Sequence, residues 1–368
     1  MIMNDLQNNE LETVLFDSHL LLNAKMVSYG GFIMPVSYPK GIQVEYFGIR
    51  NNVGIFDVSH MGEFQIMGDD ALDFLQKMTI NDVSKLNIGQ AQYSAMCNNE
   101  GGIIDDLILY RTNYGFLMVV NAANIKKDYD WLKQHAFGDA QIHDISNEIS
   151  LIAIQGPKSR NTLRQFTNVD LMMPFYSFQE GDVCGTPVMI SRTGYTGELG
   201  FEIYGNSKSI KLIWDAFIGN GIMPAGLAAR DILRMEMKYC LYGNDINEKF
   251  NPLEAGLGWV TVLGKNEFIG HGKIKSVNKV GLKKKLIAFK MEERGIARSG
   301  YEVYVEHKRI GFVTSGNFSP SLNIGIGLAY VEIPYDGMNQ QINIKVRDKF
   351  LNARIIKPPF IEKTSLHD

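Results

Sequence analysis

The spacing of apolar residues predicts strands and helices that alternate over roughly the first 250 residues. Continuous or alternating apolar runs predict strands at 62–69, 92–96, 103–111, 115–121, 149–154, 187–192 and 200–204. Apolar residues at helical spacing predict helices at 41–52, 69–78, 122–137, 207–219 and about 226–240, with a further helix beginning in QGPKSRNTLRQF. The stretch GFIMPVSYPKG, residues 31–41, is expected to be a loop because it holds two prolines. Strand–strand–helix order of this kind is typical of an α+β fold.

The pattern changes after residue 250. An irregular stretch opens at Asn251-Pro252, and from about 282 onward short apolar runs are separated by turn sequences such as NFSP, YDGM and RDK. Several short strands at this spacing predict a small β-barrel at the C-terminal end. At about 100–200 residues per domain, the 368 residues predict two or three domains.

The composition is that of a globular protein with a sizeable core, since 45% of the residues are hydrophobic and 21% are charged. The formal net charge of −3 gives no general attraction to nucleic acid or to an anionic membrane. No apolar run approaches the ~20 residues of a membrane helix, and the first residues resemble neither a signal nor a transit peptide, so we expect a soluble cytoplasmic protein. The three cysteines and seven histidines are scattered without the spacing of a metal site, and no metal is expected.

Two adjacent carboxylates lie inside an apolar run in the stretch NNEGGIIDDLILYR, residues 98–111. In a strand, neighbouring side chains point to opposite faces, so Asp105 and Asp106 are expected on different faces. Both faces are otherwise apolar: Ile103, Leu107 and Leu109 would accompany Asp105, and Ile104, Ile108 and Tyr110 would accompany Asp106. A buried carboxylate needs a cation, hydrogen bonds or a shifted pKa. The stretch therefore indicates either a carboxylate directed into a cavity or a turn after the glycines whose backbone satisfies the acids.

Five separated stretches carry a family resemblance when they are taken together. They are FDVSHMGEF (56–64), CNNEGGIIDDL (97–107), SRTGYTGELGFE (191–202), PAGLAARDILRMEMKYCLYGNDI (224–246) and TSGNFSPSL (314–322). In this order they resemble the T-protein of the glycine cleavage system, a family of tetrahydrofolate-dependent aminomethyltransferases. Each stretch alone is a weak signal, but the resemblance extends over almost the whole chain.

The resemblance implies a three-domain clover-leaf of the α+β class, with two α/β-sandwich-like domains and a C-terminal β-barrel domain. The first, folate-binding domain would be discontinuous and would consist of residues 1–60 and 148–250. The second would be the inserted segment 61–147, and residues 251–368 would form a linker and the barrel domain. Folate would bind in a central hole of the clover-leaf.

The resemblance also implies the reaction and the residues that perform it. Lipoylated H-protein, the expected partner, would deliver an aminomethyl group, and its one-carbon unit would pass to tetrahydrofolate as co-substrate, giving ammonia and 5,10-methylenetetrahydrofolate. Asp106 would be the catalytic carboxylate beside the positive charge that develops at the transferring carbon, and Asp105 would be structural. The folate and substrate contacts would come from Glu202, Arg230, Tyr195, Tyr93, Tyr239, Met61, Asn121 and Asn124. Neither a metal nor a nucleic acid or membrane partner is implied.

Simpler interpretations of two of these residues stay open at this point. Glu202 alone could be a surface acid at the start of a strand, and Arg230 alone could pair with Asp231 or Glu236 on a helix surface. The chain also departs from the family pattern at its end. Some members carry a tyrosine beyond the final Pro-Phe that contacts the substrate, whereas the residues after Phe360 read IEKTSLHD and include no aromatic.

Two other functions are compatible with the same fold. A folate-dependent demethylase of sulfonium or methylamine compounds would keep the folate pocket and change the donor side. A non-catalytic folate-binding accessory protein, of the kind linked to iron–sulfur assembly, would carry a KxCxxG motif, which residues 238–243 match. The continuation of that motif as NDI, together with the GGIIDD, GYTGE and AARD stretches, favours the aminomethyltransferase.

Overall fold

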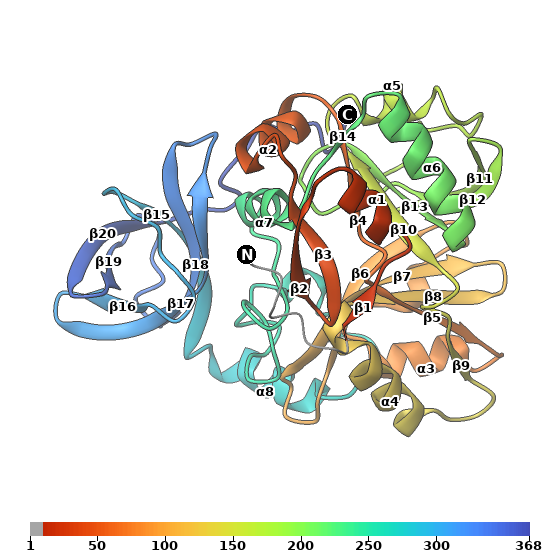
Figure 1. Ribbon diagram of the computed structural model, residues 1–368. Coiled ribbons are helices and arrows are strands. Elements are labelled where there is room, and N and C mark those ends of the chain that lie inside the picture. The colour runs from red at the N-terminus through yellow and green to blue at the C-terminus, as the bar shows by residue number, and fades with distance from the viewer. Residues whose placement is uncertain (1–9) are drawn as a thin grey trace.

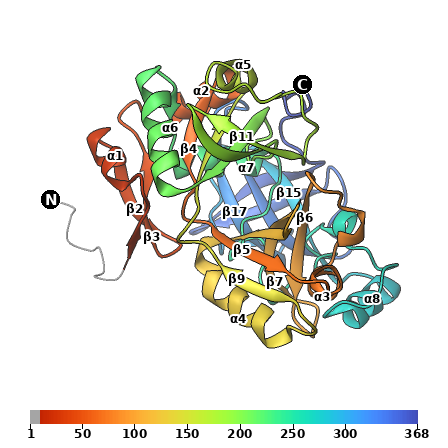
Figure 2. The same ribbon diagram turned by 90° about the vertical axis from the view of Figure 1, so that its right-hand side faces the viewer.

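The computed structural model of the protein describes residues 10–368 and consists of three sheets and a closed barrel (Figure 1). The barrel lies at one end of the molecule and the two larger sheets at the other, with the helix α7 (Leu227–Glu236) between them. From the side that carries the sheets, the barrel lies behind them (Figure 2). The α+β fold class and the C-terminal barrel predicted from the sequence are confirmed.

The strands before residue 250 form one small sheet and two large ones. The small sheet has the order β1 (Leu11–Glu12), β3 (Phe32–Ser37), β2 (Lys25–Tyr29). The six-stranded sheet has the order β11 (Phe178–Val183), β12 (Thr186–Ser191), β13 (Gly200–Gly205), β10 (Ser150–Gln155), β4 (Gly54–Asp57), β14 (Met223–Pro224). The five-stranded sheet has the order β6 (Ala91–Cys97), β7 (Ile103–Thr112), β8 (Gly115–Val120), β5 (Gly62–Met67), β9 (Gln141–Asp144).

The barrel closes through six antiparallel strands. Their order is β15 (Lys284–Met291), β18 (Ile324–Glu332), β17 (Lys308–Ser319), β16 (Glu302–Val305), β19 (Gln341–Val346), β20 (Lys349–Ile356). Phe289, Val313 and Ile344 are among the buried residues of its interior. Closure pairs every strand on both sides, so the barrel exposes no free sheet edge.

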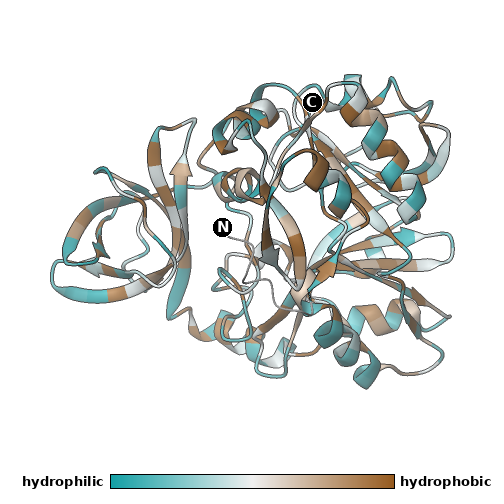
Figure 3. Ribbon diagram, viewed as in Figure 1, coloured by the Kyte–Doolittle hydropathy of each residue, from teal (hydrophilic) through white to brown (hydrophobic). Residues whose placement is uncertain are grey.

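Helices cover the outer faces of the two large sheets. The helices α5 (Ser159–Leu163) and α6 (Ser207–Gly219) lie on the six-stranded sheet, and α3 (Ala71–Met78) and α4 (Ile125–His135) lie on the five-stranded sheet. In Figure 3 the central strands are mostly hydrophobic, whereas α4 at the edge of the molecule is largely hydrophilic. The remaining helices are α1 (Phe16–Leu21), α2 (Ile42–Asn51) and α8 (His271–Val280), with 3-10 turns at Val83–Lys85, Ala122–Asn124 and Gly258–Val260.

The inner faces of the two large sheets share one hydrophobic core. Val119 of β8, Leu151 of β10, Tyr204 of β13 and Ala229 of α7 belong to the same buried cluster. The chain leaves the six-stranded sheet after β4 and returns to it at β10, and the residues between form the five-stranded sheet. Any site between the sheets is therefore built from both. The domain division at residues 60, 147 and 250 stays a prediction.

Two local predictions are wrong. Residues 32–37 of the predicted proline-containing loop form the strand β3, which pairs with β1 as far as Ile33 and with β2 along its length. The pairing with β2 shifts register next to Pro35. A proline is tolerated there because the missing N–H falls beside an irregularity in the ladder. The helix predicted to run to about residue 240 ends at Glu236, since Lys238 has a positive φ of 60°.

A buried ionic network connects α2, α7 and the barrel. The carboxylate of Glu236 accepts hydrogen bonds from Tyr46 (2.8 Å), Arg50 (2.5 Å) and Ser319 of β17 (2.5 Å). Arg50 also pairs with Glu198 at 2.8 Å. All five side chains except that of Ser319 come from the part of the chain before the barrel, so this network fixes the barrel against the sheets.

Arg50→Met is expected to lower the free energy of unfolding by about 3–5 kcal/mol, because it removes the cation from a buried pair and leaves the Glu236 carboxylate uncompensated. Urea unfolding followed by circular dichroism measures this change. Lys126→Met is the matched control, since Lys126 pairs with Asp130 on the exposed face of α4. Equal effects of the two substitutions would show that the buried network does not stabilise the fold.

Candidate active site

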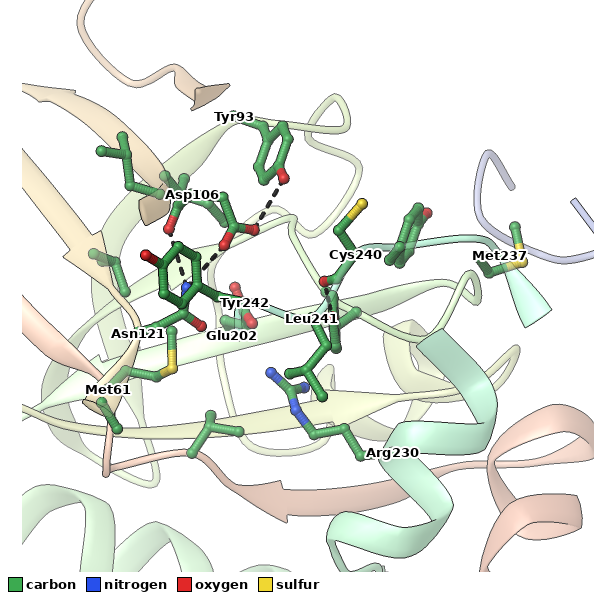
Figure 4. Close-up of a pocket in the computed structure, with 18 of the residues that line it drawn as sticks. Met61, Tyr93, Asp106, Asn121, Glu202, Arg230, Met237, Cys240, Leu241 and Tyr242 are labelled. Atoms are coloured by element: carbon green, nitrogen blue, oxygen red, sulfur yellow. Dashed lines mark hydrogen bonds between the residues drawn. The ribbon is translucent and has the colours of Figure 1, made fainter. Parts of the chain in front are cut away.

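A cavity of about 600 Å³ opens between the two large sheets, α7 and the segments that follow it. Its wall combines residues of β2, β6, β7, β8 and β13 with the segments 237–244 and 255–259. All nine residues that the sequence proposed for the site line this one cavity: Met61, Tyr93, Asp106, Asn121, Asn124, Tyr195, Glu202, Arg230 and Tyr239. Figure 4 shows most of them around the same space.

Asp106 presents its carboxylate to the cavity from β7. One oxygen accepts a hydrogen bond from the Tyr93 hydroxyl at 2.9 Å, and the other accepts from the Asn121 side-chain amide at 2.9 Å (Figure 4). Burial, followed by the charge of Asp105, raises the pKa of Asp106 to about 7. The carboxyl group can therefore change its protonation state near neutral pH.

Asp105 is buried on the other side of β7 and does not line the cavity. It accepts hydrogen bonds from the backbone N–H of Asn121 (3.0 Å) and from the side-chain amides of Asn121 (2.8 Å) and Asn124 (2.7 Å). Burial and, as the second largest cause, the negative charge of Asp105 raise the pKa of the neighbouring Asp128 to about 11, so Asp128 is neutral at pH 7. The amide of Asn121 thus joins the two adjacent acids, of which Asp106 lines the cavity and Asp105 does not.

The strand that carries these acids is irregular. The pairing of β6 with β7 shifts register between Met96 and Cys97, opposite Ile103 and Asp105. As a result Ile104, rather than Ile103, joins the buried cluster of Leu107 and Leu109. The predicted faces of these two isoleucines were wrong, because strict alternation does not survive a bulge.

Glu202 lies in the interior of β13, where it pairs with Ala153 of β10. Its side chain is buried, and one oxygen accepts a hydrogen bond from the Thr193 hydroxyl at 2.5 Å. Burial raises its pKa, whereas the bond from Thr193 and the charge of Arg230 lower it. The interpretation of Glu202 as a surface acid is therefore wrong.

Arg230 extends from α7 toward the cavity (Figure 4). Its guanidinium carbon lies 4.7 Å from the centre of the Tyr195 ring, and Nη1 is buried without a hydrogen-bond partner among the described residues. Asp231 pairs instead with Arg234 (2.8 Å), and Glu236 pairs with Arg50. The interpretation of Arg230 as half of a surface ion pair is wrong, and the guanidinium has unused donors directed at the cavity.

Aromatic rings form much of the remaining wall. Tyr195 stacks on Tyr239, with ring centres 5.7 Å apart, and donates its hydroxyl hydrogen bond to the backbone carbonyl of Cys240. Tyr93 stacks on Trp259, with ring centres 6.0 Å apart. Because Trp259 is 71% exposed, this stack connects Asp106 with the outside of the molecule.

Sequence reasoning missed several lining residues, among them Tyr29, His60, Tyr176 and Trp259. Burial lowers the pKa of His60 to about 4, so its imidazole is neutral, and Nδ1 has no partner in the described part of the chain. His60 belongs to the stretch FDVSHMGEF, which was the available signal. Trp259 carried no signal, because it follows an irregular segment without a recognisable motif.

Known proteins resemble this chain over nearly its whole length. The GCVT N-terminal domain model matches residues 15–265, and the glycine cleavage T-protein C-terminal barrel domain model matches residues 284–362. The chain belongs to the glycine cleavage T-protein family. Proteins named aminomethyltransferase from Flavobacterium psychrophilum and Phocaeicola vulgatus are 47% and 46% identical to it, each over 95% of this chain and 99% of the relative.

A solved structure supports the same family assignment. The crystal structure of glycine cleavage system aminomethyltransferase T from Bartonella henselae has a TM-score of 0.91 and 32% identity, over 96% of this chain and 99% of that one. The family resemblance, the transferase class and the aminomethyltransferase activity predicted from the sequence are confirmed. The individual residue roles stay predictions.

Two further observations concern what the described residues contain. No helix within residues 10–368 is long and apolar enough to span a membrane. Over the same residues, no three His, Cys, Asp or Glu side chains come together in an arrangement that could hold a metal ion. The cytoplasmic location stays a prediction.

Asp106→Asn is expected to make the protein more stable at pH 8 than the unsubstituted chain. The folded state binds the Asp106 proton more tightly than the unfolded chain, with a pKa of about 7 against an ordinary 3.8, so raising the pH across this interval destabilises the fold. The cost of the ionised carboxylate is up to about 4 kcal/mol above pH 7 and absent below about pH 4. Urea unfolding of both proteins from pH 4 to pH 8 measures it, and a stability difference that does not change with pH would contradict the assignment.

Proposed function

We propose that this family member transfers the one-carbon unit of an aminomethyl group from the lipoyl arm of H-protein to tetrahydrofolate, releasing ammonia and giving 5,10-methylenetetrahydrofolate. The observation that carries the proposal is a half-buried carboxylate, Asp106, in the same cavity as a second carboxylate and a guanidinium whose Nη1 has no partner among the described residues. The family and the names of its members support the glycine cleavage system as the setting.

Glu202 provides the contact that selects a pterin. A carboxylate with one oxygen held by Thr193 keeps acceptor capacity for the two-donor edge formed by the amino and N–H groups of a pterin. The stacked pair of Tyr195 and Tyr239 supplies flat apolar surface for the rest of the ring. Arg230 supplies donors to a carbonyl or carboxylate oxygen of the folate.

Asp106 provides the charge that the chemistry needs. Positive charge develops at the carbon that leaves the lipoyl sulfur, and a carboxylate fixed by Tyr93 and Asn121 needs no reorganisation to stabilise it. The approach of that charge favours the ionised form of a carboxyl group whose pKa is about 7. Asp106 can also accept a hydrogen bond from a folate nitrogen.

The lipoyl arm has to reach Asp106 from outside, so the docking surface lies beside an opening of the cavity. A transient delivery of this kind needs only a modest, partly polar interface. We further propose the domain division drawn from the family: residues 1–60 with 148–250, the inserted segment 61–147, and the C-terminal segment 251–368. In this division all three parts of the chain line the cavity, the third through residues 255–259.

The two alternative functions are less well supported. An accessory protein that works through the KxCxxG motif needs an available thiol, but Cys240 is buried and its burial raises its pKa to about 12. A neutral, buried thiol is a poor nucleophile and metal ligand. A demethylase would keep the same cavity, and the names of the relatives favour aminomethyl transfer over it.

Asp106→Asn is expected to lower turnover by a factor that corresponds to about 2.7–4 kcal/mol of transition-state stabilisation, with folate affinity nearly unchanged. The assay combines the protein, tetrahydrofolate and aminomethylated H-protein, and follows ammonia and 5,10-methylenetetrahydrofolate. The substitution keeps the size of the side chain and removes its charge.

Asp105→Asn is the matched control, because it alters the adjacent acid on the other side of the strand and is expected to reduce the melting temperature more than the turnover. An active Asp106→Asn variant and an inactive Asp105→Asn variant would reverse the assignment of the two acids. Turnover with a sulfonium donor in place of the lipoyl donor would instead support the demethylase.

A further inference from the structure

Lys238 has a backbone conformation that a lysine rarely adopts. Its φ is +60°, in the left-handed region, directly after the end of α7. Its backbone N–H donates to Met235 at 2.9 Å and that of Tyr239 donates to Arg234 at 2.9 Å, which satisfies the last carbonyls of the helix. Glycine is the usual residue at such a helix end because it has no β carbon. A lysine at this position costs stability, so its side chain needs an explanation.

Lys238 lines the cavity and belongs to the segment in which Met237 and Cys240 are labelled in Figure 4. A β carbon placed on Gly256 would lie only 2.7 Å from Nζ of Lys238, so the ammonium lies against the backbone of Gly256. Gly256 itself lines the cavity and has a φ of +77°. Two left-handed backbone positions therefore place this ammonium in the cavity wall.

The ammonium has no anionic partner within residues 10–368. The negative charge of Asp245 raises the pKa of Lys238, but Asp245 is already bound to Arg234 at 2.7 Å and accepts a hydrogen bond from Thr314. Burial lowers the pKa of Lys238, as expected for a cation that lacks a counter-ion. Among the described lysines and arginines, the cavity is lined by Arg230 and Lys238, and neither forms an ion pair in this part of the chain.

We propose that Lys238 binds a carboxylate of the glutamyl tail of the folate substrate. This inference rests on the proposed function, and it adds the residue that recognises the anionic end of the substrate. The glutamyl tail carries two carboxylates, and the cavity offers a planar guanidinium and a compact ammonium, neither of which forms an ion pair with another described residue. Lys238 is then retained at a position that favours glycine because a glycine there would leave a tail carboxylate without its cation.

The test compares two ligands and three variants by anaerobic calorimetry. Tetrahydrofolate carries the glutamyl tail, and tetrahydropteroate is the same molecule without it. Lys238→Gly is expected to weaken tetrahydrofolate binding about tenfold, to leave tetrahydropteroate binding unchanged, and to leave the melting temperature equal or higher, since glycine relieves the backbone strain. Lys249→Ala, which removes an exposed lysine from the chain after the same helix, should change neither affinity.

A loss of affinity for both ligands alike would overturn the proposal, because it would indicate damage to the pocket and not the loss of a carboxylate contact. Unchanged tetrahydrofolate affinity in Lys238→Gly would overturn it as well, while leaving the proposed function intact. Failure of the unsubstituted protein to bind either ligand would overturn the proposed function itself. Lys238→Arg should restore most of the tetrahydrofolate affinity, because it restores the positive charge.

Discussion

The side-chain amide of Asn121 holds two adjacent carboxylates at once, the buried Asp105 and the half-buried Asp106, and the geometry of the whole site depends on this contact. It donates to Asp105 at 2.8 Å and to Asp106 at 2.9 Å from the residue that follows β8. These hydrogen bonds hold both side chains in place and offset part of the free-energy cost of removing the two carboxyl groups from water. Asp128 stays neutral beside Asp105, which limits the negative charge that accumulates around Asp106.

The scaffold places Asp106 in the same cavity as a carboxylate from the other large sheet. Asp106 comes from the five-stranded sheet, Glu202 from the six-stranded sheet and Arg230 from α7. The shared hydrophobic core brings the two sheets together, and the buried network of Arg50 and Glu236 fixes α7 against the barrel. Packing and buried ion pairs thus hold the walls of the cavity in place, which suits electrostatic stabilisation of a developing charge.

The apolar pattern predicted most elements because their faces are buried against one partner, as in α6 and the strands of the barrel. It failed at Pro35, where the missing N–H falls beside an irregular pairing, and at Ile104, where a bulge reverses the expected face. The family resemblance named residues that line one cavity, but it did not indicate their surroundings. Among the described residues, Nη1 of Arg230 has no partner because Arg234 binds Asp231 and a distant residue, Arg50, binds Glu236, which no local pattern reveals.

The most direct test of this account is a crystal structure of the protein with 5-methyltetrahydrofolate, which resembles the folate substrate and cannot accept the one-carbon unit. The account predicts the amino and N–H edge of the pterin within about 3 Å of the Glu202 carboxylate, with Asp106 beside the N5 side of the ring. It also predicts the contact from Asn121 to Asp106 unchanged. A pterin ring bound away from both carboxylates, or a glutamyl tail directed at Asp106, would contradict it.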